Sequence, residues 1–266
     1  MARLAGKISV IMPAFNEASH IERNLRETVD TLAGLEYDFE VIVVDDGSRD
    51  DTWRVAADSL AGHYSNVRLL RYDDNEGKGN AVMRGTAAAN GDYIVFLDAD
   101  MDLHPAQLPV FFDIMAQENA DVVIGSKLHP RSNVNYPLSR RIVTMGYYTL
   151  VRLLFGLPLR DTQTGLKLFK AAVLRRVFPK VLVKRFAADI EMLVVAHSLG
   201  YKIREAPVTL RFQRRFGRIR TRDVKDIVQD TLAIFYRLNI LRYYDSISEE
   251  WPAPRQEIKE LVGSKQ

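Results

Sequence analysis

Three carboxylates spaced two residues apart follow a short apolar segment near the middle of the chain. The apolar segment covers residues 93–97, and the acids are Asp98, Asp100 and Asp102. The segment has the composition of a buried strand, so alternate residues beyond it would share one side if the extended geometry continued. Gathered carboxylates repel one another unless a cation lies among them, and a hard divalent ion shared with substrate phosphates satisfies them. We therefore predict a Mg²⁺ or Mn²⁺ site for a nucleotide diphosphate, with a solvated acidic turn as the alternative.

The elements around these acids alternate between short apolar runs and helical patterns. We expect strands at residues 8–12, 39–44, 67–71, 93–97 and 121–125, and helices at 21–34, 50–60, 80–89 and 105–117. Such alternation predicts an α/β fold with a Rossmann-like, doubly wound and mostly parallel sheet. The polar turns at 13–17, 45–48 and 75–79 each follow a strand, so they should meet the acids at the ligand-binding edge. The chain lacks a G-x-G-x-x-G motif after its first strand and a P-loop, which argues against dinucleotide-binding and ATPase functions.

The second half of the chain is less regular and carries a cluster of arginines. We expect helices at 139–155, 186–199 and 223–241, a strand at 201–212 and a loose polar tail from Ser246. The arginines are Arg211, Arg214, Arg215, Arg218, Arg220 and Arg222. Such a cluster attracts phosphate on a nucleotide, a lipid or a nucleic acid; no nucleic-acid-binding motif is present, so we expect no nucleic-acid partner. We divide the chain into a main domain, residues 1–212, and a C-terminal extension, residues 213–266, with the basic segment, an amphipathic helix and the tail.

The composition excludes several kinds of site. The 266 residues include no cysteine, which rules out disulfides, thiolate zinc sites and a cysteine nucleophile. The five histidines show no metal-ligand spacing. The N-terminus lacks the apolar core of a signal peptide, and no apolar run reaches the roughly 18–20 residues of a membrane span. From these features we expect a cytoplasmic protein.

Four motifs occur in order along the first part of the chain: PAFNE at 13–17, VDDGS at 44–48, GKG at 77–79 and LDAD at 97–100. With this ordered set, the chain resembles the inverting family 2 glycosyltransferases of GT-A fold over nearly its whole length. Within that family it is similar to the dolichyl- or polyprenyl-phosphate sugar synthases. Residues 160–169 and 186–191 look most like dolichyl-phosphate glucosyltransferase, whereas residues 214–217 with Arg220 resemble the basic segment of dolichyl-phosphate mannose synthase.

The resemblance implies a role for each matching residue around the nucleotide. The base and ribose pocket would be lined by Pro13, Phe15, Glu17, Val44 and Asp46. Asp98 and Ala99 would contact the nucleotide, and Asp100 would bind the metal ion. Asp102 stands where these synthases often have a glutamine ligand, and it would supply a second hard oxygen to the metal.

Other residues would act on the phosphates and the acceptor. The resemblance implies that Arg214 and Arg220 meet phosphate charge at the reaction centre, although Arg220 stands where a lysine is usual. Lys78 begins a helix after a glycine-rich turn, which is either a phosphate-binding position or only a helix start. Asp189 and Glu191 open a later helix; either could act as a general base toward a hydroxyl acceptor, or both could serve only the helix N-terminus.

The activity implied is transfer of glucose or mannose from UDP-glucose or GDP-mannose to a polyprenyl or dolichyl phosphate, with residues 161–165 favouring glucose. The acceptor phosphate is anionic at neutral pH, so it requires positioning and charge screening and no proton-abstracting base. A metal at Asp100 would act as a Lewis acid on the departing diphosphate. We expect a peripheral protein at the cytoplasmic face of the membrane. Two alternatives stay open: a related transferase with a soluble or cell-wall polysaccharide acceptor, and a non-catalytic nucleotide-sugar-binding module.

Overall fold

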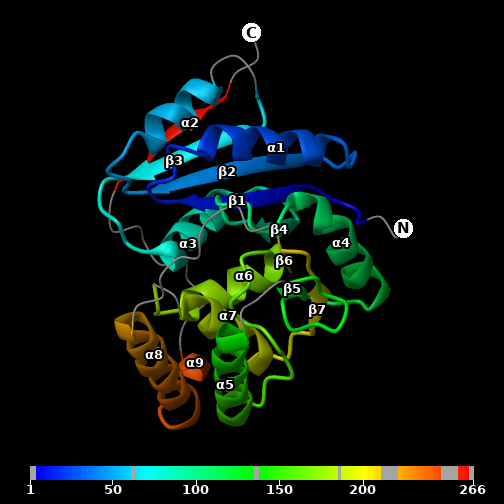
Figure 1. Cartoon of the computed structure of the whole chain (residues 1–266), viewed down its shortest axis with the longest axis vertical. Coiled ribbons are helices and arrows are strands. Elements are labelled where there is room, and N and C mark those ends of the chain that lie inside the picture. The colour runs from blue at the N-terminus through cyan, green and yellow to red at the C-terminus, as the bar shows by residue number, and fades with distance from the viewer. Residues whose placement is uncertain are drawn as a thin grey trace.

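An eight-stranded sheet runs through the part of the chain that the computed structural model describes, which is residues 4–60, 64–134, 138–184, 187–210, 221–246 and 257–263. The strand order is β7-β5-β6-β4-β1-β2-β3-β8 (Figure 1). The strands are β1 (Ile8–Ala14), β2 (Phe39–Asp46), β3 (Val67–Tyr72), β4 (Tyr93–Phe96), β5 (Val122–Ser126), β6 (Lys167–Lys170), β7 (Ile203–Pro207) and β8 (Lys259–Val262).

The directions of these strands confirm the predicted mostly parallel α/β sheet. The neighbours β3, β2, β1 and β4 are parallel to one another, and β5 is parallel to β7. Only β6 and β8, among the described strands, run antiparallel to their neighbours. The central strands β1 and β2 are buried along nearly their whole length, as expected where both faces of a sheet are covered.

Helices cover both faces of the sheet. They are α1 (Ile21–Ala33), α2 (Thr52–Leu60), α3 (Lys78–Ala88), α4 (Leu108–Gln117), α5 (Leu138–Phe155), α6 (Ala171–Val177), α7 (Ala188–Ser198), α8 (Thr221–Asn239) and α9 (Tyr243–Ser246), with 3₁₀ turns at Pro105–Gln107 and Phe178–Lys180. Because side chains alternate along a strand, Val10 of β1 packs in the same cluster as Leu25 of α1, whereas Ile11 packs in the cluster that contains Ala81 of α3. The molecule therefore has three layers, as a doubly wound sheet requires.

The C-terminal ends of the parallel strands meet at one edge of the sheet. The register places Pro13 beside Val44, and Asp46 beside Tyr72. β4 pairs with β1 only as far as Phe96, so the acids that follow β4 extend beyond the sheet. Open α/β sheets bind their ligands at this edge, which is where the sequence motifs gather.

Helices α5, α8 and α9 lie together at one end of the molecule, beyond α7 (Figure 1). Glu191 of α7, which has no exposed surface, joins them to the rest of the fold. Its Oε1 accepts hydrogen bonds from Arg237 Nη2 (2.9 Å) and the Tyr244 hydroxyl (2.6 Å). Its Oε2 accepts from the backbone N–H groups of Leu182 (2.9 Å) and Val183 (2.6 Å). Among the described helices, none has both the length and the apolar character needed to cross a membrane.

The expectation of a loose tail from Ser246 is wrong for residues 259–262, which form the edge strand β8. β8 pairs antiparallel with β3, and two ion pairs support it: Arg68 Nε with Glu260 Oε1 (2.7 Å) and Lys259 Nζ with Asp73 Oδ1 (3.1 Å). The expected strand at 201–212 is shorter, because β7 ends at Pro207. The edge strand β8 has four residues and pairs with β3, about two hundred positions earlier in the chain. The periodicity of its polar sequence therefore gives no local indication of a strand.

Replacing Glu191 with alanine should strongly destabilise the protein. The change leaves the half-buried Arg237 guanidinium without its carboxylate and removes the acceptor from Tyr244 and two backbone N–H groups. We therefore expect a loss of about 3 kcal/mol or more in the free energy of unfolding. Urea denaturation followed by circular dichroism measures this loss.

The matched control is Glu118→Ala, which removes an exposed ion pair with Arg204 (2.6 Å) and should change stability by less than about 1 kcal/mol. If the alanine variant of Glu191 does not fold, Glu191→Gln provides the measurement. Equal unfolding midpoints for the Glu191 and Glu118 variants would contradict the anchoring role.

Candidate active site

A cavity of about 450 Å³ opens at the carboxyl edge of the parallel strands. It is lined by Pro13, Ala14, Phe15, Glu17, Asp46, Asn75, Gly77, Lys78, Asp98, Ala99 and Asp100. Small-molecule sites typically have volumes of about 300–1,000 Å³. The cavity brings together every residue predicted to contact the nucleotide except Val44, which is fully buried in β2.

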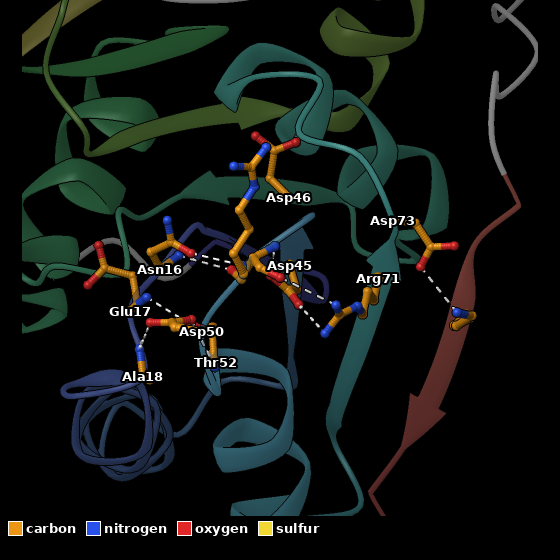
Figure 2. Close-up of polar contacts among 12 residues, drawn as sticks. Asn16, Glu17, Ala18, Asp45, Asp46, Asp50, Thr52, Arg71 and Asp73 are labelled. Atoms are coloured by element: carbon orange, nitrogen blue, oxygen red, sulfur yellow. Dashed lines mark hydrogen bonds and ion pairs between the residues drawn. The ribbon is translucent and has the colours of Figure 1, made fainter.

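The loop after β1 is held against the turn after β2. The backbone N–H of Asn16 donates to Ser48 Oγ (2.9 Å), and Asn16 Oδ1 accepts from the backbone N–H of Arg49 (2.9 Å). The backbone N–H of Glu17 donates to Thr52 Oγ1 (2.7 Å; Figure 2). Asn16 has a φ of 57°, a conformation that asparagine tolerates better than most residues. The PAFNE and VDDGS motifs therefore form one unit that shapes one wall of the cavity.

The two adjacent acids at the end of β2 have different surroundings. Asp45 is completely buried and forms an ion pair with Arg71 Nη1 of β3 (3.2 Å), which Figure 2 shows. Its Oδ1 also accepts a hydrogen bond from the backbone N–H of Ser48 (3.1 Å). Because neighbouring residues of a strand face opposite sides, Asp46 is turned the other way, and it lines the cavity.

Asp46 organises the turn that leads into α3. Its carboxylate accepts hydrogen bonds from the Tyr72 hydroxyl (2.6 Å), from Asn75 Nδ2 (3.0 Å), and from the backbone N–H groups of Glu76 (2.9 Å) and Gly77 (3.0 Å). Burial raises the pKa of Asp46, and these hydrogen bonds act in the opposite direction. Tyr72 was not predicted from the sequence. Its hydroxyl reaches Asp46 only because β2 and β3 pair.

Lys78 and Asp98 form an ion pair at the wall of the cavity, with 2.6 Å between Nζ and Oδ1. Burial alone would lower the pKa of Lys78, but the carboxylates of Asp98, Asp189 and Asp100 outweigh it, and the pKa lies above its usual range. Burial would raise the pKa of Asp98, but Lys78 and other lysines lower it. Both groups are therefore charged at neutral pH. Lys78 is the first residue of α3, where the helix end also favours an anion.

Asp100 lines the cavity beside this pair. Burial, together with the charges of Asp98 and Asp102, raises the pKa of Asp100 to about 6. The condition for all three acids to share one side, that the extended geometry continues beyond the strand, is not met: β4 ends at Phe96, and Met101 has a φ of 57° that turns the chain. Asp102 consequently does not line the cavity, and its backbone N–H donates to Asp100 Oδ1 (3.2 Å). Among the described residues, no three His, Asp or Glu side chains are placed to hold a metal ion together.

The segment 161–165 borders this acidic edge. Asp161 accepts hydrogen bonds from the backbone N–H groups of Lys127 and Gln163 (3.1 Å each), so it stabilises a turn. Gly165 lies directly against Asp98, because a Cβ at this glycine would be 2.2 Å from Asp98 Oδ2. Within the segment 161–165, the backbone at Gly165 therefore lies close to the Asp98 carboxylate.

Behind the cavity, a second ion pair joins Lys167 and Asp189, with 2.8 Å between Nζ and Oδ1. Lys167 is 1% exposed and also donates to the carbonyl of Thr164. Burial lowers the pKa of Lys167, although Asp189 opposes this. Asp189 does not line the cavity, but its charge reaches Lys78. Sequence reasoning missed Lys167; the available signal was a lysine at the start of an apolar strand.

The remaining predicted residues have different outcomes. Glu191 is fully buried and accepts four hydrogen bonds, so it anchors α7 and does not face a ligand as a base. Arg214 and Arg220 lie outside the described residues. The arrangement at the cavity combines a pair of opposite charges with an acid of raised pKa, which suits a cation and a phosphate group.

Comparison with known sequences places this geometry in a family. The sequence profile described as Glycosyl transferase family 2 matches residues 9–178. A dolichyl-phosphate beta-glucosyltransferase of Dictyostelium discoideum is 32% identical over 213 residues, which are 76% of this chain and 65% of that protein. The protein of the same name from Drosophila melanogaster is 36% identical over 215 residues, covering 76% and 66%. The glycosyltransferase AglD of Haloferax volcanii is 36% identical over 204 residues, covering 76% and 32%.

Solved structures agree on the fold. Glucosyl-3-phosphoglycerate synthase from Mycobacterium tuberculosis, in complex with uridine diphosphate, superposes with a TM-score of 0.64 at 22% identity and covers 87% of this chain and 79% of its own. The chain spans about two thirds of the length of the two dolichyl-phosphate beta-glucosyltransferases that it matches. The matched profile covers more than half of the chain and includes the four motifs at the cavity. This chain therefore belongs to glycosyl transferase family 2.

Proposed function

We propose that this protein transfers glucose from UDP-glucose to a dolichyl or polyprenyl phosphate. The observation that carries the proposal is the cavity in which the PAFNE loop, Asp46, Lys78 and the acids after β4 meet. The names of the related dolichyl-phosphate beta-glucosyltransferases support glucose and a dolichyl phosphate, and they favour this acceptor over a soluble or cell-wall polysaccharide acceptor. GDP-mannose, the other donor considered from the sequence, has no such support. The division into domains at residues 212 and 213 stays a prediction.

A divalent cation, Mg²⁺ or Mn²⁺, would accompany the donor, and the residues at the cavity fit it. Asp100 offers a hard carboxylate oxygen, and its pKa is raised by burial and by the charges of Asp98 and Asp102, which a cation would balance. When bound, the ion would supply Lewis-acid stabilisation of the leaving diphosphate. Glucosyl-3-phosphoglycerate synthase, at 22% identity, has been solved in complex with Mn²⁺ and UDP-glucose. Asp102 does not line the cavity, although its backbone N–H contacts Asp100, so its role as a second ligand of the metal ion stays a prediction.

The residues at the cavity would bind the donor, orient the acceptor and screen the charges of the phosphates. The loop from Pro13 to Glu17 and the Asp46 turn would hold the nucleoside, and Lys78 would contact the phosphates. Asp189 is held in place by Lys167 outside the cavity lining, and its charge, which reaches Lys78, would help to balance the positive charge that develops on the sugar ring. If the acceptor were a hydroxyl, Asp189 would be the candidate to accept its proton. Arg214 and Arg220 would position the acceptor phosphate, which needs no base because it is already an anion. We propose a peripheral location at the cytoplasmic face of the membrane, since the acceptor is a lipid.

Replacing Asp100 with asparagine should reduce transfer by at least about a hundredfold, because the neutral amide cannot balance a cation at the leaving diphosphate. The assay follows radiolabelled glucose from UDP-glucose, with Mn²⁺, into product extractable by organic solvent when dolichyl phosphate is the acceptor. The matched control is Asp58→Asn, which removes an exposed carboxylate on α2 and should leave transfer unchanged. Near-normal transfer by the Asp100 variant, or product that stays in the aqueous phase, would contradict the proposal.

Replacing Gly165 with alanine should weaken donor binding while leaving the fold intact. The new Cβ would overlap the Asp98 carboxylate, which must shift from the position in which it pairs with Lys78. We expect at least about a tenfold loss in affinity for UDP with Mn²⁺, equivalent to about 1.4 kcal/mol, measured by titration calorimetry.

The matched control for Gly165 is Gly146→Ala in α5, where a Cβ would meet no atom within 4 Å. Alanine is also the better helix former at that position, so this variant should bind like the parent protein and be equally or more stable. Unchanged affinity in the Gly165 variant would show that the position of Asp98 does not matter to the donor.

A further inference from the structure

Helix α8 is apolar on two opposite sides. On its inner side, Ile234 is fully buried, and the ring centroid of Phe235 lies 6.3 Å from that of Phe155 in α5. The Thr231 hydroxyl is hydrogen-bonded to the Tyr147 hydroxyl of α5 (3.1 Å). These contacts satisfy the inner face of the helix, and they account for the amphipathic pattern that the sequence predicts.

The outer side of α8 carries a second apolar stripe that is exposed. It consists of Leu232 and Tyr236 of α8 and of Ile240 and Leu241, which directly follow the last residue of the helix, Asn239. Their exposed fractions are 49%, 51%, 63% and 54%. We call these four residues the outer stripe. Residues four apart lie on one face of a helix, so Leu232 and Tyr236 form a row that Ile240 continues. Contiguous exposed apolar side chains mark an interaction surface.

The outer stripe is held on a fixed support. Arg237, between Tyr236 and Ile240, points to the other side of the helix and binds the buried Glu191 of α7 (2.9 Å). Its Nε also donates to the Tyr244 hydroxyl (3.1 Å), which bonds the same carboxylate. Because α8 is anchored in this way, its outer side faces away from the rest of the fold.

We propose that the outer stripe of α8 docks on the headgroup–acyl boundary of an anionic lipid bilayer. Leucine, isoleucine and tyrosine on one face of a helix, next to basic residues, are the composition of helices that lie in a membrane interface. Residues 211–222, which lead into α8, contain six arginines and no acid, and exposed Arg242 follows the stripe. Basic residues near such a surface are attracted by anionic lipid headgroups.

This inference rests on the proposed function, because an enzyme with a lipid phosphate acceptor must meet a bilayer, and it adds which face does so. A second copy of the chain is a poorer occupant. Stable protein interfaces use about 20–30 residues from each partner, whereas the outer stripe offers four large side chains in a narrow row. A narrow apolar row that is followed by exposed Arg242 suits shallow insertion into lipid.

Flotation of the protein with vesicles tests the proposal. The vesicles are phosphatidylcholine alone or phosphatidylcholine with about 30% phosphatidylglycerol as an anionic lipid, without dolichyl phosphate. The parent protein should bind the anionic vesicles, less at high salt and less to phosphatidylcholine alone. The double variant Leu232→Ser, Ile240→Ser should bind at least about tenfold more weakly, because two large apolar side chains no longer enter the interface.

The control double variant is Val110→Ser, Val262→Ser, which removes apolar side chains that are 41% and 58% exposed on α4 and β8 and should bind like the parent. The Asp100→Asn variant should also bind vesicles normally, so failure of the transfer reaction and failure of docking can be told apart. Equal vesicle binding by the stripe and control variants would overturn the proposal. So would equal binding of the parent to neutral vesicles, or a parent dimer in light scattering that the stripe variant alone dissociates.

Discussion

The ion pair between Lys78 and Asp98 joins the first residue of α3 to the end of β4, and the rest of the site is arranged around it. The side chains are 35% and 33% exposed, so the pair lies at the boundary with solvent. An ion pair in such a position adds little to global stability, and its effect is local. It fixes one positive and one negative charge on the cavity wall, with Gly165 allowing Asp98 to lie close to the neighbouring backbone.

The sequence was sufficient to predict most of this edge, for a physical reason. Polar turns such as 45–48 and 75–79 follow buried strands, and parallel strands deliver such turns to one edge whatever the details of packing. Pro13, Asp46, Lys78 and Asp98 therefore reach the same cavity. The sequence pattern could not show that the two adjacent acids after β2 have different roles. Asp45 pairs with Arg71 inside the sheet, whereas Asp46 holds the turn before α3.

The features that were missed depend on contacts between distant segments. In the sequence, Lys167 is an ordinary lysine at the end of a strand. Only the packing of α7 brings Asp189 into contact with it. Glu191 was a candidate base until the C-terminal helices supplied Arg237 and Tyr244 as its partners. The three acids after β4 would share one side only in extended geometry, but Met101 has a positive φ, and Asp102 does not line the cavity. Local periodicity carries no information on such contacts.

The charges on the cavity wall also bear on how a donor could enter. Among the described residues that line the cavity, Glu17, Asp46, Asp98 and Asp100 oppose the ammonium of Lys78, an excess of three negative charges when every acid is ionised. A sugar diphosphate adds further negative charge, and repulsion grows as the surroundings become less polar than water. Burial and, after it, the charges of Asp98 and Asp102 raise the pKa of Asp100, so repulsion between acids already acts within the protein. A diphosphate can be accommodated here when a divalent cation travels with it, because the ion converts repulsion at Asp100 into attraction, and this electrostatic requirement supports the proposed Mg²⁺ or Mn²⁺ dependence.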